Sequence, residues 1–595
     1  MYMIPNLTKR SENIRYIEVP VPISSDVGGV GMIYMGIWWI FFAISLVSII
    51  LTFAVKKHNT EEKPFIGRIF VYVSAHRRLF LLLLFVVFLF SRLYYLGVIP
   101  SGLHVDELGM AYDAYSLSHY GIDRHHVSLP VYLENYGGGQ SALYAYLTAL
   151  LLKFVPYSPA VIRMPAVICG VFCFFAAYFL SGDLTSDMDG DKKENGWLSL
   201  MGPFFVTVTP FFMMSERWGL DCNLFLSLAA VSLCVSVRAF GKRSRGLYIL
   251  AGICWGITLY TYAISYMVIP LFAILAGIYV ICIYRDKTAV GSVVCFLAPI
   301  VILGIPLLIF QLVNMGIVNE FDLGFTQFRK LKYYRESEVS IRNIPKNLLY
   351  VFRSMYGTDG LTYNAFNEFG PVYSCMIPLA VFGGAAAVRD AAVSVGKRCF
   401  KPVVITTAFF LSSWAAILLV YGVGFNVVNF IFISHVIFAV YGMKIIFSHS
   451  RQAACVMVVC TGLYFLIFSE FYFRRQNEVY GMHSLFTSTK PGDMITYAEN
   501  MYDPAHEKKL YICMEYDDKG GLDLYAGLYG QIPPLNWDPD RTDLGDIYLN
   551  LPDEFDPDED AVYIIGDEWS GVISAILSEG YQDDTLFEHE HILHR

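Results

Sequence analysis

Three acidic residues lie in a polar stretch that directly follows an apolar run. The segment GVIPSGLHVDELGMAYDAYSLSHYG (97–121) comes straight after LFLLLLFVVFLFSRLYYL (79–96), and it contains Asp106, Glu107 and Asp113. If residues 105 to 119 form a helix, Asp106 and Asp113 share one face. A carboxylate placed there can take the proton from a hydroxyl group that attacks an activated carbon. The alternative is that these acids only cap the start of a helix, where Asp and Glu are favoured.

A second polar group lies between two later apolar runs. The stretch MMSERWGLDCNLF (213–225) contains Glu216, Arg217, Asp221 and Asn223 and leaves almost no room for a simple linker. Ionisable residues at membrane depth are candidate functional residues, because they are costly there. Arg217 and Asp221 are four residues apart and could instead pair with each other on a helix.

A third candidate segment is YGTDGLTYNAFNEFGPVY (356–373), which precedes another apolar run. Its Tyr363 and Asn364 are of types that bind sugar hydroxyls by ring stacking and hydrogen bonding, although Asn, Gly and aromatic residues are also common in turns and at membrane interfaces. Nearby, Arg329, Lys330 and Lys332 of FRKLKYY could meet either a phosphate group or lipid head groups.

The composition is that of a membrane protein. Of 595 residues, 55% are hydrophobic and only 16% charged, and the mean hydropathy is +0.49. A net charge of -9 provides no basic field, so a nucleic-acid partner is not expected. The twelve cysteines are scattered without CxxC or Cys/His metal spacing, and the tail holds only Cys513, which excludes a disulfide framework there.

Apolar runs long enough to span a bilayer recur along the chain. They cover residues 29–55, 79–98, 164–181, 197–214, 223–240, 247–262, 264–283, 289–313, 371–388, 402–421, 427–447 and 453–471. The shorter run 141–155 carries Lys153 and ends before Pro156, so we expect a helix that lies along the interface. The predicted fold is an all-α polytopic bundle of about twelve transmembrane helices.

Basic loops predict how the bundle is oriented. Lys and Arg in short loops tend to stay cytoplasmic, and the basic segments are KKHNTEEKPFIGRIFVYVSAHRR, GKRSRG, RDK, RDAAVSVGKRCFK and SHSRQ. With twelve spans all five fall on one side, together with the acidic segment GDLTSDMDGDKKENG (182–196). We therefore expect a multi-pass protein of the cell membrane with both termini extracytoplasmic.

The residues after 471 are predicted to form a small soluble α/β domain. KLYICMEY (509–516) and AVYIIGD (561–567) have the pattern of strands, whereas DMITYAENM and SGVISAILSEG have the pattern of helices. The many acids of this tail are expected to form a solvated face. The chain then divides into an N-terminal segment with one extra span (1–78), a transmembrane module (79–471) with outer loops 99–163 and 314–370, and an extracytoplasmic domain (472–595).

Taken together, these motifs resemble the GT-C class of integral-membrane glycosyltransferases. The motifs are an outer Asp-Glu pair after a span, RMP with Arg163 before the next span, GGGQSALYAYL, SERWGLD and a soluble outer tail. The resemblance is strongest to the group of protein O-mannosyltransferases and aminoarabinose transferases, in particular its bacterial members of unassigned substrate. It covers residues 80 to 470, and SERWGLD departs from the family motif by the inserted Glu216.

The resemblance implies an inverting transfer of one sugar from a polyprenyl-phosphate donor to an envelope glycan, lipid or protein acceptor. Asp106 would be the base that activates the acceptor, and Glu107 would support it. The implied substrate-binding residues are Asp113, Arg163, Arg217, Asp221, Asn223, Tyr363 and Asn364. No metal ligand set is predicted. A divalent cation is nevertheless possible, because oligosaccharide-transferring members of the class use one.

Other functions are compatible with twelve spans. A transporter or flippase for a lipid-linked saccharide should show inverted repeats and mid-span ionisable residues, whereas the acids here cluster at span ends. A ligase or polymerase that moves a whole glycan shares the fold class. A scaffold whose tail binds partners is a third alternative.

Overall fold

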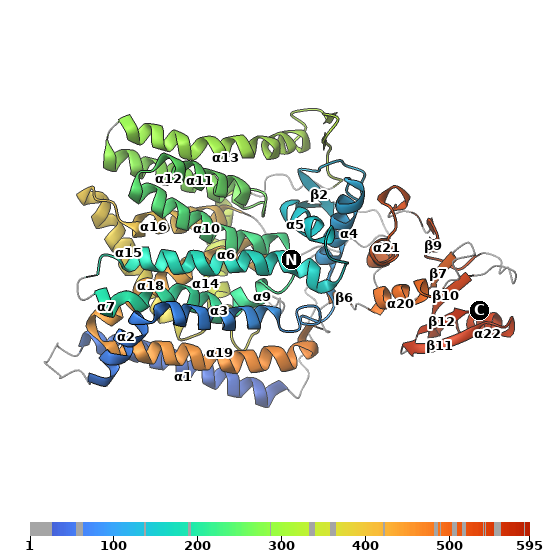
Figure 1. Cartoon of the computed structure of the whole chain (residues 1–595), viewed down its shortest axis with the longest axis horizontal. Coiled ribbons are helices and arrows are strands. Elements are labelled where there is room, and N and C mark those ends of the chain that lie inside the picture. Colours follow the sequence, from blue (N-terminus) through green and yellow to red (C-terminus); the bar gives the residue numbers. More distant parts are fainter. Residues whose placement is uncertain are drawn as a thin grey trace.

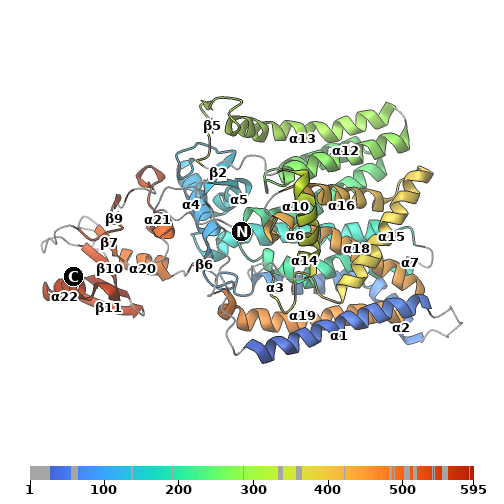
Figure 2. The ribbon, with the colours of Figure 1, turned by 180° about the vertical axis from the view of Figure 1, so that it is seen from behind.

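A computed structural model describes most of the chain. The described residues are 27–54, 64–135, 138–188, 192–285, 287–332, 339–356, 365–420, 423–480, 486–487, 490–501, 509–513, 519–538, 541, 543–552, 561–587 and 590–595. They form a helical bundle with a smaller α/β unit at one end, as Figures 1 and 2 show from opposite sides.

The bundle is built from helices of different lengths, and the long ones run roughly side by side (Figure 1). These are α1 (Val27–Ala54), α2 (Pro64–Ala75), α3 (Arg77–Leu93), α6 (Pro159–Thr185), α8 (Met201–Val208), α9 (Pro210–Ser215), α10 (Asp221–Lys242), α11 (Arg245–Thr258), α12 (Ser265–Tyr284), α13 (Lys287–Asn314), α15 (Met376–Lys397), α16 (Pro402–Leu419), α18 (Ile431–His449) and α19 (Arg451–Tyr480). Short helical turns between them are α7 (Lys192–Asn195), η1 (Gly196–Leu200) and α17 (Phe425–Val428).

The predicted fold class is confirmed. Among the described residues, nine helices are long and apolar enough to cross a bilayer, and the pair α2–α3, bent by 81°, makes a possible tenth. The other two predicted runs form shorter helices, Gly196–Val208 and Arg245–Thr258. At 1.5 Å per residue, helix α11 alone reaches only about 21 Å, less than the hydrocarbon core of about 30 Å.

The run predicted over 197–214 is a broken helix. Helix α8 ends at Val208, Thr209 is extended (ψ 130°), and α9 restarts with Pro210 as its first residue. Proline disfavours helical backbone in the residue before it and lacks an N–H, so it suits a helix start and not a helix interior. This break turns the chain so that Ser215 to Arg217 reach the end of the bundle near α4.

Several short elements cover that end of the bundle. They are β1 (Leu103–His104), α4 (Val105–Tyr120), β2 (Tyr132–Asn135), β3 (Gly138–Ser141), α5 (Leu143–Leu152), β4 (Phe321–Asp322), β5 (Gln327–Phe328), η2 (Ile341–Asn343) and α14 (Ile344–Tyr356). Helix α5 is ten residues long, packs on α4 and α6, and leaves Leu150 and Phe154 exposed beside it. It is too short to cross a bilayer, in keeping with the expected interfacial helix.

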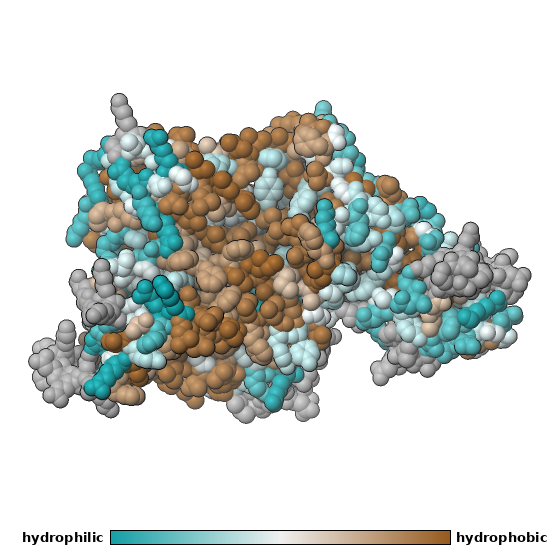
Figure 3. All heavy atoms as spheres, in the orientation of Figure 1, coloured by the Kyte–Doolittle hydropathy of each residue, from teal (hydrophilic) through white to brown (hydrophobic). Residues whose placement is uncertain are grey.

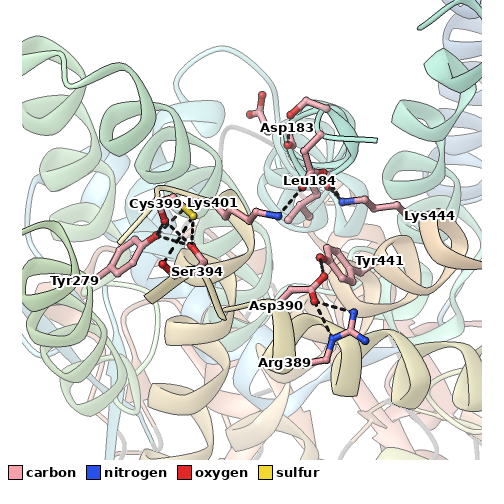
Figure 4. Close-up of polar contacts among 12 residues, drawn as sticks. Asp183, Leu184, Tyr279, Arg389, Asp390, Ser394, Cys399, Lys401, Tyr441 and Lys444 are labelled. Carbon is pink, nitrogen blue, oxygen red and sulfur yellow. Dashed lines mark hydrogen bonds and ion pairs between the residues drawn. The ribbon is translucent and has the colours of Figure 1, made fainter. Parts of the chain in front are cut away.

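The two ends of the bundle are polar and the surface between them is apolar (Figure 3). At the end away from α4, Lys401 and Lys444 both pair with Asp187, and Tyr441 donates to Asp390 at 2.6 Å. Figure 4 shows this cluster joining α6, α15, α16 and α18. Asp187 of the acidic segment therefore lies at the same end of the bundle as Lys401 and Lys444, whose charges compensate its own.

The C-terminal unit is a sheet with helices on both faces. Its elements are β6 (Phe486–Thr487), α20 (Lys490–Glu499), β7 (Lys509–Cys513), α21 (Lys519–Tyr529), η3 (Pro534–Asn536), β8 (Asp543–Leu544), β9 (Ile547–Tyr548), β10 (Ala561–Gly566), η4 (Asp567–Trp569), α22 (Ser570–Ser578), β11 (Gln582–Phe587) and β12 (Glu590–His594). The strand order is β11-β12-β10-β7-β9-β8, with β7 parallel to β10 and β9. The strands and helices predicted in this tail are all present, while residues 514–516 lie outside the described part.

This unit is docked on helix α4. Tyr112 and Tyr115 of α4 donate hydrogen bonds to the carbonyls of Ile532 and Gln531, at 3.0 and 3.1 Å. One buried hydrophobic cluster contains residues of α4, α5, α21, β7 and β10. Helix α19 also continues to Tyr480, so the proposed domain boundary at 471 stays a prediction.

The docking predicts how two glycines of α21 respond to substitution. A Cβ at Gly527 would lie 2.7 Å from the ring of Tyr112, whereas Gly521 has nothing within 4 Å. Both Gly→Ala changes should gain about 1 kcal/mol of helix propensity. Only Gly527→Ala should also lose about 1–3 kcal/mol to overpacking. We expect limited proteolysis to release the C-terminal unit faster from Gly527→Ala than from the matched Gly521→Ala, and equal rates would contradict the docking.

Candidate active site

Helix α4 begins at the end of the bundle and its first turn is tightly held. His104 is the N-cap residue: its Nδ1 accepts the backbone N–H of Asp106 at 3.1 Å, while the Glu107 carboxylate accepts the backbone N–H of His104 at 3.1 Å. Because Nδ1 is an acceptor, the imidazole ring is neutral. The capping role considered for the acids therefore applies to Glu107.

Glu107 is also half of a fully buried ion pair. Arg163 of α6 donates to it through Nε at 2.8 Å and Nη2 at 3.3 Å, and the backbone N–H of Gly219 donates at 2.7 Å. Arg163 further donates to the carbonyls of Leu96, Pro100 and Gly102. A guanidinium has five N–H donors, so these contacts engage all of them. The pair fixes α4 relative to α6 and to the loop before α4.

Arg217 also holds backbone carbonyls at this end of the bundle, but those of helix α3 and the residues after it. It donates to the carbonyls of Ser91 and Arg92 at 2.8 Å, of Tyr94 at 2.7 Å and of Ile99 at 3.0 Å, which closes the end of helix α3. Its neighbour Glu216 pairs with Arg92 at 2.8 Å, with both side chains buried. The alternative in which Arg217 pairs with Asp221 is not the arrangement found.

Asp106 faces a different set of partners from Glu107. Asn135 of β2 donates to Asp106 Oδ1 at 3.1 Å, and His104 Nδ1 lies 3.6 Å from Oδ2. The side chain keeps 14% of its surface exposed, whereas the side chain of Glu107 is fully buried. Asp106 is thus the acid of this pair that solvent can reach.

Asp221 lies close enough to Asp106 to interact with it electrostatically. It is the first residue of α10, and it accepts the backbone N–H groups of Ser141 at 2.9 Å and Cys222 at 2.7 Å. Asn223, two residues further on, donates instead to the carbonyl of Trp218 at 3.2 Å and is buried. Asp106 and Asp221 are therefore brought together, while Asn223 serves the local backbone.

The hairpin β2–β3 completes the site with uncharged groups. Within the described part of the chain, Gln140 Nε2 is buried without a hydrogen bond, and the hydroxyl of Ser141 lies within reach of Asp221 and of the Tyr266 hydroxyl. Ser141 and Tyr266 lie beside Asp221, and Gln140 shares Asn135 with Asp106. These uncharged polar groups therefore form one buried cluster beside Asp221.

Asp113 is buried two turns along α4 and contacts Arg124. The backbone N–H of Arg124 donates to its Oδ1 at 3.1 Å, and Arg124 Nε lies 3.7 Å away. Burial raises the pKa of Asp113, although the positive charge of Arg124 beside it acts in the opposite direction. Asp113 thus supports Arg124 from the interior.

The basic residues of the outer loop lie near the hairpin. Arg329, Lys330 and Lys332 are exposed, and Lys332 is close enough to Glu134 of β2 to interact electrostatically. The loop is attached there by Thr326, which donates to the carbonyl of Leu129 at 3.0 Å.

Tyr363 and Asn364 lie outside the described residues, so their role stays a prediction. In the described ranges, no group of three or more His, Cys, Asp or Glu side chains is arranged to hold a metal ion.

Residues missed by sequence reasoning are Asn135, Gln140, Ser141, Tyr266 and Arg124. The first three come from ENYGGGQS, a glycine-rich stretch whose hairpin signal could have been recognised from the sequence. Tyr266 and Arg124 carry no local signal, because they reach the site only through tertiary packing.

The Glu107–Arg163 pair predicts a large loss of stability when one partner is neutralised. We expect Glu107→Gln to lower the free energy of unfolding by about 3–5 kcal/mol, because a buried arginine is left unpaired. Asp543→Asn, in the exposed pair with Arg541, should cost less than about 1 kcal/mol. Thermal unfolding in detergent checks both, and a Glu107→Gln protein of unchanged stability would contradict the structural role.

No protein-family model matches the sequence, and no curated protein matches it. Among solved structures, ArnT of Cupriavidus metallidurans in the apo state has 9% identity and a TM-score of 0.49, covering 88% of this chain and 98% of its own. ArnT bound to undecaprenyl phosphate has 10% identity and a TM-score of 0.45, covering 87% and 98%. The archaeal oligosaccharyltransferase AglB of Archaeoglobus fulgidus has 12% identity and a TM-score of 0.40, covering 75% and 63%. All three likenesses have TM-scores below 0.5 and identities of 12% or less.

Proposed function

We propose that this chain is a membrane glycosyltransferase that moves one sugar from a polyprenyl-phosphate donor to an acceptor on the extracytoplasmic face. The observation that carries the proposal is the position of Asp106. Its carboxylate is held by Asn135 and the first turn of α4 at the end of the apolar belt, and it remains partly exposed. A lipid-linked donor cannot leave the bilayer, so its reacting carbon must be met at this boundary.

Asp106 acts as the general base. The acceptor hydroxyl oxygen forms a bond to the anomeric carbon while the bond from that carbon to the phosphate oxygen breaks. Asp106 takes the hydroxyl proton, and the lipid phosphate leaves with the bonding electron pair. Such a base must lie within about 2.6–3.2 Å of the proton donor, a distance that only a solvent-accessible carboxylate can offer to a substrate.

Uncharged donors hold the sugars. Among the described residues, Gln140 Nε2 is buried without a hydrogen bond, and the hydroxyls of Ser141 and Tyr266 lie close to each other and to Asp221. A hydroxyl-rich ligand can form hydrogen bonds with these groups. Binding of this kind discriminates strongly, because an analogue without the hydroxyl leaves these groups unpaired.

The exposed basic residues meet the leaving phosphate. All donors of Arg163 are engaged by Glu107 and by backbone carbonyls, and Arg217 is engaged by four carbonyls. Arg329, Lys330 and Lys332 are exposed next to the hairpin and can provide positive charge to a phosphate at the membrane boundary.

Replacing Asp106 by Asn should abolish transfer without unfolding the protein. Loss of a general base lowers the rate about 10²–10⁴-fold, so a deletion strain carrying Asp106→Asn should lack the same envelope sugar as the deletion strain itself. The wild-type gene should restore that sugar. Mass spectrometry of extracted envelope glycans and lipids measures the outcome.

The matched control is Asp546→Asn, which changes an exposed acid of the C-terminal unit and should restore the sugar fully. Restoration by Asp106→Asn would refute the assignment of Asp106 as the base. Loss of a whole glycan in the deletion strain, instead of one sugar, would favour a ligase or polymerase.

Neutralising the basic residues should weaken binding of a lipid phosphate. The triple change Arg329→Gln, Lys330→Gln and Lys332→Gln removes three positive charges, which we expect to weaken undecaprenyl phosphate binding at least about tenfold. Binding of undecaprenol, which lacks the phosphate, should not change. Titration of purified protein in nanodiscs measures both, and an equal loss for the two lipids would contradict a phosphate site.

A further inference from the structure

Between Asp106 and Asp113, helix α4 has one position without a side chain, and neighbouring residues pack against its backbone there. Gly109 lies there, and a Cβ on it would come within 2.3 Å of Asn135 Oδ1 and 2.7 Å of Arg124 Nη1. These two side chains therefore lie directly against the helix backbone. Only glycine leaves room for them at this position.

Arg124 links Asp113 of α4 to Asn135, the residue whose amide contacts Asp106. On one side its backbone N–H and Nε approach Asp113 Oδ1, at 3.1 and 3.7 Å. On the other side its Nη2 donates to Asn135 Oδ1 at 2.6 Å and to the carbonyl of Glu134 at 2.9 Å. Arg124 is 3% exposed, so its charge acts in an interior of low dielectric.

The contact with Arg124 decides which way the amide of Asn135 points. A guanidinium can only donate hydrogen bonds, so it must face the amide oxygen. The amide NH2 group is then directed to Asp106 Oδ1 at 3.1 Å and Gln140 Oε1 at 3.2 Å. A flipped amide would place its NH2 group against the guanidinium and its oxygen against the carboxylate, so both contacts would be repulsive.

The C-terminal unit covers Arg124. The guanidinium lies 5.7 Å from the ring centre of Trp537, and Asp523 of α21, 8% exposed, interacts with it electrostatically. His126 of the same loop contacts the carbonyl of Pro534 through Nε2 at 2.8 Å. The docked tail therefore keeps water from the arginine.

We propose that Arg124 is a positioning residue for Asp106, because it fixes the amide of Asn135 with its NH2 group toward the carboxylate. The importance of Asp106 for transfer rests on the function proposed above. The geometry of Arg124 and Asn135 does not depend on that function.

The arrangement favours the ionised form of Asp106. The groups near its carboxylate include the Asn135 amide from β2, the neutral His104 ring from the start of α4, and Asp221 and the Cys222 thiol from α10. Asp221 opposes ionisation of Asp106, whereas the amide of Asn135 donates a hydrogen bond that stabilises the ionised form. Without it, Asp106 should bind a proton at higher pH.

The test measures protonation of Asp106 without any substrate. Dicyclohexylcarbodiimide modifies protonated carboxyl groups in apolar surroundings, and peptide mass spectrometry locates the adduct. In the full-length protein in detergent, Arg124→Gln should raise the pH midpoint of Asp106 labelling by about one unit, a tenfold change in proton affinity. Arg124→Lys also presents only donors and should keep most of the native midpoint. Arg541→Gln, an exposed arginine of the C-terminal unit, should not change it.

Two further variants keep the test decisive if Arg124→Gln folds poorly. Asn135→Ser removes the amide directly and should raise the midpoint by a similar amount, and Gly109→Ala should do so by displacing Asn135. If Arg124 acts through Asn135, the double variant Arg124→Gln, Asn135→Ser should not exceed the shift of Asn135→Ser alone.

An unchanged midpoint in Asn135→Ser, or fully additive shifts in the double variant, would overturn the proposal. Either result could occur while Asp106→Asn still abolishes transfer. Conversely, a shifted midpoint together with full activity of Asp106→Asn would overturn the proposed function alone. The two failures are therefore distinguishable.

Discussion

The buried ion pair between Glu107 and Arg163 is the contact on which the site depends. It joins the first turn of α4 to α6, and Arg163 also holds the carbonyls of the loop that leads into α4. Because Asp106 is the preceding residue, its direction is set by this pair. Buried charges are tolerated only when fully paired, and here each donor of the guanidinium has an acceptor.

Because buried charges must be paired, the buried arginines and the exposed basic residues have different roles. Arg163 and Arg217 use their donors on carbonyls and on Glu107, so they shape the end of the bundle. The basic residues after β5 are exposed, and Asp106 keeps part of its side chain exposed. The docked C-terminal unit adds a further layer, because it encloses Arg124 behind the hairpin that contacts Asp106.

Much of the fold could be predicted from the sequence, because a bilayer demands long apolar segments with internally satisfied backbones. Each of the twelve apolar runs coincides with helical structure, the run 141–155 contains a short helix beside α4, and the strands around residues 511 and 563 belong to one sheet. The lengths of the individual helices were less predictable from the sequence. Pro210 interrupts one span, and α11 is shorter than its apolar run, because hydropathy does not report where a helix breaks.

The sequence by itself determined the membrane class, the two acidic clusters at span ends and the α/β tail, since these follow from local composition and periodicity. Only the tertiary structure decided which acid is buried against an arginine and which keeps contact with solvent. It also decided that Asn135 contacts Asp106, that Arg124 contacts Asn135, and that Tyr266 lies near Asp221. These contacts depend on how the loop after α4, the hairpin and the helices pack together, which no local pattern in the sequence records.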